Sequence, residues 1–430
     1  MESCASSTDI GTYHQQSLRQ RKERAMICTG IDWSDKHHDL CILDEAGEKL
    51  DSFSISHSQD GFELAHRRIA KYANPEQVKV AIETKDSLLV DFLSELGYTL
   101  YFLNPKQTDR FRDRHRMSRS KSDSFDAYVL ADAVRTDAHL FNALSPLDEQ
   151  SLLLRVLTRT REGMVNRKVA VQNEITTYLK RYFPVALELF GGIDNLEAIG
   201  FLLQYPTYDQ ARSVSKVRIA SILGNKADVS KAIAARHAQQ AHDKLNDPQP
   251  VPAAGVSRSY PLAVKSLLRQ LRGILEEMDA LEDDIRDSYD KHPNKDLIAS
   301  LPGVADTLGP VIAAELGTDI ARYANIGTLK AFGGSSPVTV QSGKFRSVHF
   351  RRACNGHLRR ALHLAAQGAI RKAGWARELY DRLRAEGKSY GRALRSVADQ
   401  LLEMLYVILA RRTPYDEAYH LRMKALHGKA

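Results

Sequence analysis

Apolar and polar residues alternate with the short period of β-strands and the longer period of α-helices between residues 26 and 138. Apolar alternation predicts strands over residues 26–33, 39–43, 49–56, 77–82 and 98–103. Helical spacing covers residues 61–72, 88–96 and 122–136. Gly47 suits a hairpin turn, Gly97 a helix C-terminus and Ser122 a helix N-cap. Three strands followed by alternating helices and strands predict a mixed sheet covered by helices.

The pattern becomes helical after residue 145. Two long amphipathic runs, residues 151–183 and 260–289, indicate an antiparallel arm resembling a coiled coil. An intramolecular helical hairpin explains them equally well. The composition of residues 246–257 is typical of a linker, and from residue 297 the chain reads as a mostly helical domain with a helical tail over residues 356–411. The expected organisation is a flexible tail (1–25), an α/β domain (26–145), a helical arm with a variable insert (146–295) and a helical C-terminal domain (296–430).

Basic residues exceed acidic ones only mildly, 61 to 53, for a formal charge of +8. Their placement says more, because basic side chains gather in two short stretches. The first stretch holds Arg110, Arg112, Arg114, Arg116, Arg119 and Lys121, and the second holds Lys344, Arg346, Arg351, Arg352, Arg359 and Arg360. Such clusters suit binding to a nucleic-acid backbone. Solvated helix faces are an equally good reading of either cluster alone.

The four cysteines, Cys4, Cys28, Cys41 and Cys354, have no paired spacing, which argues against a zinc site or a disulfide framework. We expect reduced thiols in a cytoplasmic protein. No apolar run reaches the length of a membrane span, and the polar start does not resemble a signal peptide. Residues 1–24 read as a loose tail or as the product of a misassigned translation start.

Four acidic residues fall where one α/β fold would bring them together. Asp32 ends the first predicted strand, Glu83 ends the fourth, and Asp123 and Asp126 begin the last helix. The two helical acids are three residues apart, so we expect both on the face that continues through Leu130 toward the sheet. Carboxylates held this close repel one another unless a cation binds them, and Mg²⁺ prefers oxygen ligands. Each acid by itself reads as well as a helix cap or a surface charge.

This order of acids resembles the ribonuclease-H-like superfamily, in its RuvC-like form, where carboxylates from the first strand, the fourth strand and the last helix share metal. The sugar-kinase and actin-like ATPase fold begins with a similar aspartate-bearing hairpin. That alternative needs a second glycine-rich phosphate loop near the middle of the chain, and none is found there.

Two C-terminal motifs involve phosphate chemistry. Residues 301–310, LPGVADTLGP, resemble a helix–hairpin–helix element that contacts DNA phosphates, although Ala305 stands where a second glycine is common; a packing role is the alternative. Residues 341–344, QSGK, cannot form a Walker loop because Val338 replaces the required glycine. The Ser342-Gly343 pair beside basic residues suits a hydroxyl nucleophile, though Ser-Gly is also a common turn.

The chain as a whole resembles the IS110 family of insertion-sequence transposases, the DEDD-type enzymes described as bridge-RNA-guided recombinases. The resemblance rests on seven segments that follow the family's order through both domains: GIDWSDKHHDLCILDEAG, AIETK, NPKQTDRFR, KSDSFDAYVLADA, LPGVADTLGPVIAAELG, SSPVTVQSGKFR and NGHLRRALHLAAQ. The turn over residues 334–337 departs from the family's glycine–leucine–x–proline pattern, since it reads Gly-Ser-Ser-Pro.

The resemblance implies a site and a set of partners. Asp32, Glu83, Asp123 and Asp126 would bind one or two Mg²⁺ ions, and Ser342 would form a covalent link to DNA. It also implies double-stranded target and donor DNA, a noncoding bridge RNA, and assembly as a dimer or tetramer in which Ser342 of one subunit meets the acids of another. No membrane partner is expected.

Two other functions use parts of the same pattern. A metal-dependent nuclease or junction resolvase would use the four acids with water as nucleophile and would not need Ser342. A protein that only binds DNA or RNA would keep the basic clusters and tolerate loss of the acids.

Overall fold

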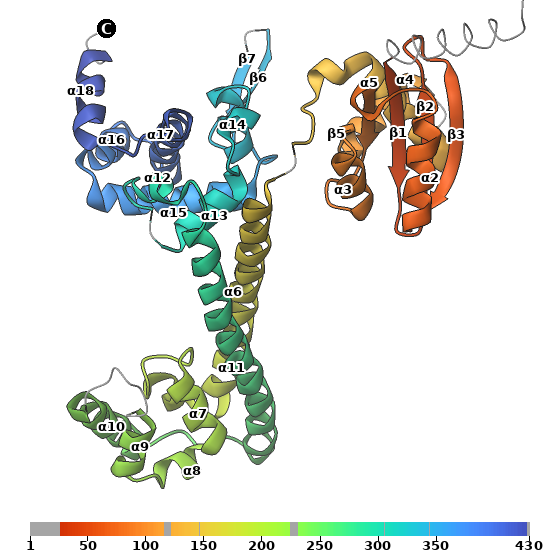
Figure 1. Ribbon diagram of the computed structural model, residues 1–430. Coiled ribbons are helices and arrows are strands. Elements are labelled where there is room, and N and C mark those ends of the chain that lie inside the picture. The colour runs from red at the N-terminus through yellow and green to blue at the C-terminus, as the bar shows by residue number, and fades with distance from the viewer. Residues whose placement is uncertain are drawn as a thin grey trace, which may run out of the picture. The chain divides into compact units, whose positions relative to one another are not determined.

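The computed structural model describes residues 26–115, 122–145, 147–223, 231–304, 306–343 and 345–427. These residues form two compact units, residues 1–146 and 147–430 (Figure 1). None of the described helices is both long and apolar enough to cross a lipid bilayer.

The first unit is built on a five-stranded mixed sheet of order β3-β2-β1-β4-β5. Its strands are β1 (Ile27–Trp33), β2 (His37–Leu43), β3 (Lys49–Ser56), β4 (Val78–Ile82) and β5 (Thr99–Phe102). The three N-terminal strands pair antiparallel, while β4 and β5 run parallel to β1. All five predicted strands are therefore present, and Gly47 has the positive φ of 92° that its predicted hairpin turn requires.

Helices cover both faces of this sheet. Its helices are α2 (Gln59–Ile69), α3 (Leu88–Glu95), α4 (Pro105–His115) and α5 (Asp123–Asp137). The core formed with α2 and α3 contains Ile31, Leu40 and Phe62, whereas α5 packs on the opposite face against Cys28, Cys41 and Ala81. The pattern did not predict α4, because this basic segment has only one buried residue and no apolar stripe.

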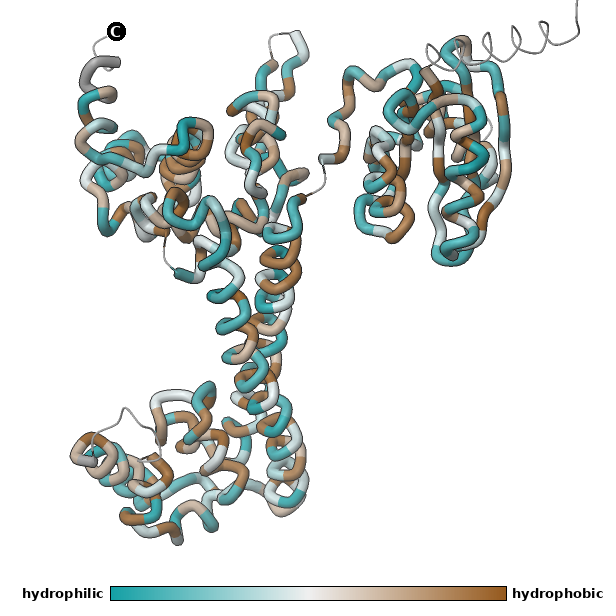
Figure 2. The backbone as a smooth tube through the Cα atoms, viewed as in Figure 1, coloured by the Kyte–Doolittle hydropathy of each residue, from teal (hydrophilic) through white to brown (hydrophobic). Residues whose placement is uncertain are grey.

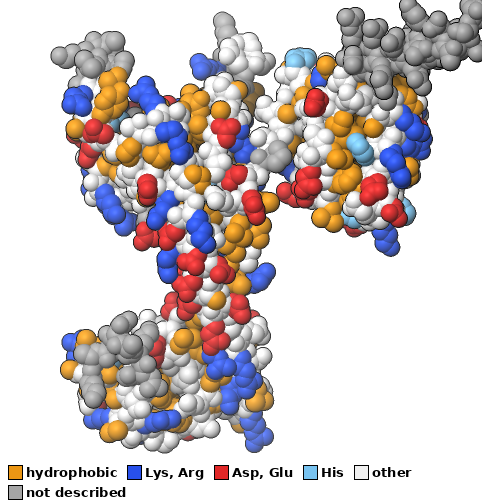
Figure 3. All heavy atoms as spheres, viewed as in Figure 1, with side chains coloured by type: hydrophobic (Ala, Val, Ile, Leu, Met, Phe, Trp, Pro, Cys, Tyr) orange, Lys and Arg blue, Asp and Glu red, His pale blue; other side chains and the backbone are white. Residues whose placement is uncertain are grey.

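The second unit is almost entirely helical. Its long helices α6 (Glu149–Tyr182) and α11 (Ala254–Asp290) lie side by side. Arg161 contacts Glu282, and Tyr178 contacts Tyr260, so the two helices run antiparallel. Residues 254–257, expected in a linker, instead form the first turn of α11. Figure 3 shows acidic side chains along the middle of this helical pair.

Two hydrophobic cores stabilise this unit. One lies where α6 ends and α11 begins and includes α7 (Leu196–Gln204), α8 (Tyr208–Arg212), α9 (Lys216–Leu223) and α10 (Lys231–Asn246). The other belongs to the C-terminal helices α12 (Lys295–Ala299), α13 (Leu308–Leu316), α14 (Ile326–Gly333), α15 (Gly356–Lys372), α16 (Gly374–Ala385) and α17 (Tyr390–Arg411), which α18 (Glu417–His427) follows. Hydrophobic residues recur along these helices at the spacing that buries one face of each (Figure 2).

A β-hairpin that the sequence pattern did not predict interrupts these helices. Its strands, β6 (Val338–Ser342) and β7 (Phe345–His349), pair antiparallel, and nearly all their side chains are exposed. The alternation in β6 is limited to Val338 and Val340, which is too short a pattern to identify a strand in sequence. The hairpin therefore carries Ser342 away from any core.

Candidate active site

The sheet and α5 approach each other closely at Gly30. A Cβ atom on Gly30 would lie 2.0 Å from the carbonyl oxygen of Ala127 and 2.4 Å from the amide nitrogen of Ala131. Only glycine fits between backbones this close. The contact fixes the position of α5 along β1, and it explains why the strand carries a glycine two residues before Asp32.

Asp32 lies on the face of β1 that α5 covers. Cys28 packs beside Leu130 and Val134, and Gly30 lies against Ala127. Two residues along β1 advance about 6.6 Å, and about four residues of a helix advance by a similar length. Each step of two residues along β1 is therefore matched by about four residues of α5, counted toward its N-terminus. The next step on this face reaches Asp32 and the first turn of α5, where Asp123 and Asp126 lie.

Two further carboxylates flank Asp32 in the sheet. Asp39 of β2 is the antiparallel partner of Asp32, and paired residues share a face. On the other side, Ile31 of β1 pairs with Ile82, the last residue of β4, and Glu83 is the next residue along the chain. Asp32 and Asp39 are thus paired across two neighbouring strands, and Glu83 directly follows the end of a third.

Asp39 is a residue that the sequence reasoning missed. Burial raises the pKa of its carboxyl group, and the negative charge of Asp123 raises it further. Asp123 is therefore close enough to Asp39 on β2 for their charges to repel each other. One sequence signal was available: in HDLCIL, residues 38–43, Asp39 shares a strand face with buried Cys41 and Leu43.

The two acids of α5 differ from the expectation that both face the sheet. Asp126 is 2% exposed, whereas Asp123 lies exposed in the first turn. The buried carboxylate of Asp126 accepts a hydrogen bond of 2.7 Å from Nε of Arg112 on α4. Hydrogen bonding to Asp126 raises the pKa of Arg112, so the guanidinium group stays charged. Ser122 occupies the N-cap position of α5, but its side chain makes no capping hydrogen bond.

The donors of this region suit a hard divalent cation, because they are carboxylate oxygens. Within the ranges described above, however, no three acidic, histidine or cysteine side chains lie close enough to hold a metal ion. Asp126 is bound by Arg112 instead. The residues fit such an ion by their chemistry.

Ser342 ends β6, and its side chain is exposed at the tip of the hairpin. Gly343 follows in a left-handed conformation with φ of 54°, and a Cβ atom built there would meet no described atom within 4 Å outside its two neighbours in the chain. Ser342 therefore belongs to the second unit, and the four acids belong to the first.

The first basic cluster lies partly on α4. Arg110 and Arg114 are exposed there, but Arg112 is bound to Asp126 and to Asp109. Arg116, Arg119 and Lys121 lie outside the described residues. The exposed arginines remain candidates for phosphate contacts, while Arg112 has a structural partner.

The second basic cluster surrounds the base of the hairpin and the start of α15. Arg346 and Arg352 are exposed, and Lys344 lies outside the described residues. Arg351 donates a hydrogen bond of 3.0 Å to the carbonyl oxygen of Ser336. Arg359 lies over the ring of Phe350.

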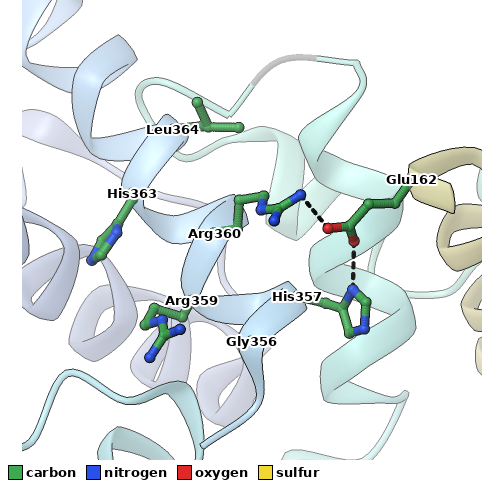
Figure 4. A pocket seen from close by; sticks show the side chains of 7 residues that line it. All are labelled: Glu162, Gly356, His357, Arg359, Arg360, His363 and Leu364. Atoms are coloured by element: carbon green, nitrogen blue, oxygen red, sulfur yellow. Dashed lines mark hydrogen bonds and ion pairs between the residues drawn. The ribbon is translucent and has the colours of Figure 1, made fainter. Parts of the chain in front are cut away.

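Arg360 has an acidic partner on the arm helix α6. Glu162 binds both Arg360 and Nδ1 of His357, and all three residues line a cavity of about 410 Å³ (Figure 4). Figure 4 shows the Glu162 carboxylate between these two basic side chains, with His363 and Arg359 farther along α15. A phosphate that binds Arg360 must therefore compete with Glu162 for it.

A buried carboxylate joins α6, α13 and α15. Glu315 of α13 has no exposed surface and accepts hydrogen bonds from Arg159 of α6 and from Asn355, the N-cap of α15. Burial alone would raise the pKa of Glu315, but these hydrogen bonds and the charges of Arg159 and Arg155 outweigh it and lower the pKa. This junction holds the arm against the helix that follows the hairpin.

The LPGVADTLGP segment packs inside its own unit. Gly303 has φ of 85°, and a Cβ there would lie 2.1 Å from the carbonyl oxygen of Ala365 on α15. The turn that could have faced a phosphate is thus covered by a helix, which favours the packing role of this motif.

Comparisons with known proteins match two parts of the chain. Residues 29–184 match the DEDD transposase family of IS110, and residues 295–381 match the transposase family of IS116, IS110 and IS902. The mini-circle protein for IS117 of Streptomyces coelicolor is 30% identical over 404 residues, which cover 91% of this chain and 95% of that protein.

Other relatives also match over most of their length. The 44.8 kDa protein of insertion element IS116 from Streptomyces clavuligerus is 26% identical over 91% of this chain and 96% of its own length. The 43.6 kDa protein of IS110 from Streptomyces coelicolor is 29% identical over 69% of this chain and 72% of its own length. The chain belongs to the IS110 family of insertion-sequence transposases.

Proposed function

We propose that this transposase cleaves and rejoins DNA with Ser342 as the nucleophile and with Asp32, Glu83, Asp123 and Asp126 as the ligands of Mg²⁺, on a ribonuclease-H-like first unit. The observation that carries the proposal is the register of β1, β2 and β4. This register pairs Asp32 with Asp39 and ends β4 one residue before Glu83. Like charges gathered in this way favour a divalent cation.

Ser342 supplies the nucleophile in this proposal. Its hydroxyl attacks a DNA phosphodiester, forms a phosphoserine ester and releases the 3′- or 5′-hydroxyl of the broken strand. A hydroxyl of a second strand then attacks the ester, restores a phosphodiester and releases Ser342. When bound, the divalent ion supplies stabilisation of the charge that develops on the phosphate oxygens.

The location of Ser342 supports this role. It is exposed on a hairpin whose strands have no buried face, and Arg346 lies on the opposite strand of the hairpin. An exposed tip can reach into a DNA groove, and a nearby arginine can bind the phosphate.

The partners also belong to the proposal. DNA partners follow from transposase activity, whereas we propose in addition that a noncoding RNA guides the choice of DNA and that the protein acts as a dimer or tetramer. Because Ser342 and the acids lie in different units, the site can be completed by Ser342 of one subunit and the acids of another.

Trapping the covalent intermediate tests the proposal. Incubation with Mg²⁺ and element-end DNA should yield a protein–DNA adduct that survives denaturation, and Ser342→Ala should abolish both adduct and cleavage. Ser347→Ala, on the other strand of the same hairpin, is the matched control and should retain both. Cleavage that persists in Ser342→Ala without an adduct would assign the reaction to a water nucleophile.

A further inference from the structure

A second cavity lies at the base of the hairpin that carries Ser342. It has a volume of about 680 Å³, within the range of about 300–1,000 Å³ that ligand sites occupy. Both ends of the hairpin form one wall of the cavity, through Pro337 before β6 and His349 at the end of β7. The remaining walls come from α16 and α17. The five-residue strands place it roughly 15 Å from Ser342.

Two arginine side chains pack against an aromatic ring that lines this cavity. Phe350 is 43% exposed, and the guanidinium groups of Arg359 and Arg395 lie 5.0 and 5.1 Å from its ring centre. Arg392, one turn before Arg395 on α17, also lines the cavity. Within the part of the chain that the structure describes, neither Arg392 nor Arg395 has a carboxylate partner. These two arginines are available to an anionic ligand.

The cavity also contains polar atoms without a partner. Among the described residues, neither Oγ of Ser335 nor Oδ1 of Asp399 has a hydrogen-bond partner, and both atoms are buried. The other carboxylate oxygen of Asp399 binds Lys330 at 2.8 Å. An unpaired buried acceptor is costly, and a rotation of the side chain that turns it toward a hydrogen-bond donor of a ligand in the cavity removes that cost. Leu379 and Leu383 add an apolar wall.

A nucleotide combines these features. Its phosphate matches two arginines, its base matches an apolar wall, and the amino group of cytosine or adenine matches a carboxylate acceptor. We propose that this cavity binds one unpaired nucleotide of the DNA strand that Ser342 attacks. Arg392 and Arg395 then hold its phosphate, and Ser335 and Asp399 bind the edge of its base. This inference rests on the proposed function, since it takes the strand at the hairpin to be DNA.

Binding of single strands to the full-length protein tests the inference without any cleavage. The probes are an oligodeoxycytidylate and an abasic strand of the same length, measured by fluorescence anisotropy at several salt concentrations. The wild type should bind the base-bearing strand more tightly, by roughly 5- to 100-fold. Equal binding of the two strands would overturn the proposal.

Two variants test how much the base contributes to binding, apart from the phosphate. Ser396→Phe fills the cavity from α17 without changing its charge, so it should bring the ratio of the two affinities close to one. Val407→Phe, which introduces the same aromatic side chain at an exposed position of the same helix, should keep the wild-type ratio. Thermal melting establishes that both variants fold, and an unchanged ratio in folded Ser396→Phe would contradict the site.

Arg395→Met should weaken the binding of both strands. It should also reduce the slope of log affinity against log salt concentration by about one, whereas Arg382→Met on α16 should change neither. An oligoribocytidylate should bind no more tightly than its DNA counterpart; an RNA preference that Ser396→Phe removes would overturn the assignment to DNA. Because these assays need no reaction, they can fail while the Ser342 adduct is observed, and the adduct can fail while they succeed.

Discussion

Nε of Arg112 lies 2.7 Å from Oδ1 of Asp126, and only 3% of the Asp126 side chain is exposed. Arg112 comes from α4 and Asp126 from the first turn of α5, on either side of residues 116–121. The arginine therefore occupies the carboxylate that we propose as a metal ligand. A metal ion bound at Asp126 would therefore share this carboxylate with Arg112 or displace it.

Replacing Arg112 by Met should make stability depend more strongly on Mg²⁺. Without the ion, the buried carboxylate of Asp126 loses its ion pair with Arg112, which should cost about 3 kcal/mol of unfolding free energy. Added Mg²⁺ should restore much of this loss, because a ligand that binds the native state stabilises it. Melting temperatures with and without Mg²⁺ measure the effect, and Arg114→Met, an exposed position of the same helix, is the control. An equal Mg²⁺ shift in wild type and Arg112→Met would contradict a role for Asp126 as ligand.

Replacing Asp32 by Asn should lower the rate of DNA cleavage by on the order of 100-fold or more, because the amide keeps the shape and loses the charge that faces the metal. Asp35→Asn removes an equal charge from the exposed turn after β1 and should leave cleavage unchanged. Gel assays of strand cleavage with Mg²⁺ compare the three proteins. Full activity of Asp32→Asn would exclude the acidic site.

Replacing Glu315 by Gln should strongly destabilise the second unit. The change leaves the half-buried Arg155 and the exposed Arg159 with a weaker acceptor at a fully buried position. Losing one partner of a fully buried ion pair costs about 3–5 kcal/mol, and because these arginines are partly exposed we expect about 3 kcal/mol. Glu282→Gln removes the half-exposed partner of Arg161 on the same arm and should cost less than about 1 kcal/mol. Urea denaturation measures both, and similar losses in the two variants would show that the Glu315 junction contributes little.

Asp148 should make stability depend on acid pH. Burial opposes its ionisation, but hydrogen bonds from the backbone and hydroxyl groups of Ser151 and Thr318 outweigh it and lower its pKa from 3.8 to about 2. Because the folded pKa is the lower one, its stabilisation is present above pH 4 and is lost as the pH falls toward 2. After allowance for partial exposure, we expect on the order of 1 kcal/mol.

Comparison with Asp148→Asn isolates this contribution from the titration of other groups. The difference in urea midpoint between wild type and variant should grow between pH 2 and pH 4 and stay constant above it. A difference that does not change over this range would rule out the proposed titration.

The local pattern of apolar and polar residues was sufficient to predict most of the strands and helices of the first unit. Alternating apolar residues marked all five strands, and glycine marked the turn at Gly47 and the end of α3 at Gly97. The helix α4 and the hairpin around Ser342 escaped prediction, because neither buries an apolar face. Burial creates the periodic signal, so elements that remain exposed leave none.

The sequence by itself determined which strand or helix end carries each of Asp32, Glu83, Asp123 and Asp126, because periodicity and turn residues set those ends. Only the tertiary structure decided what surrounds them. It paired Asp126 with Arg112, left Asp123 exposed and set Asp39 opposite Asp32. These relationships depend on strand register and helix packing, which join residues far apart in the chain, and a local pattern carries no record of such distant partners.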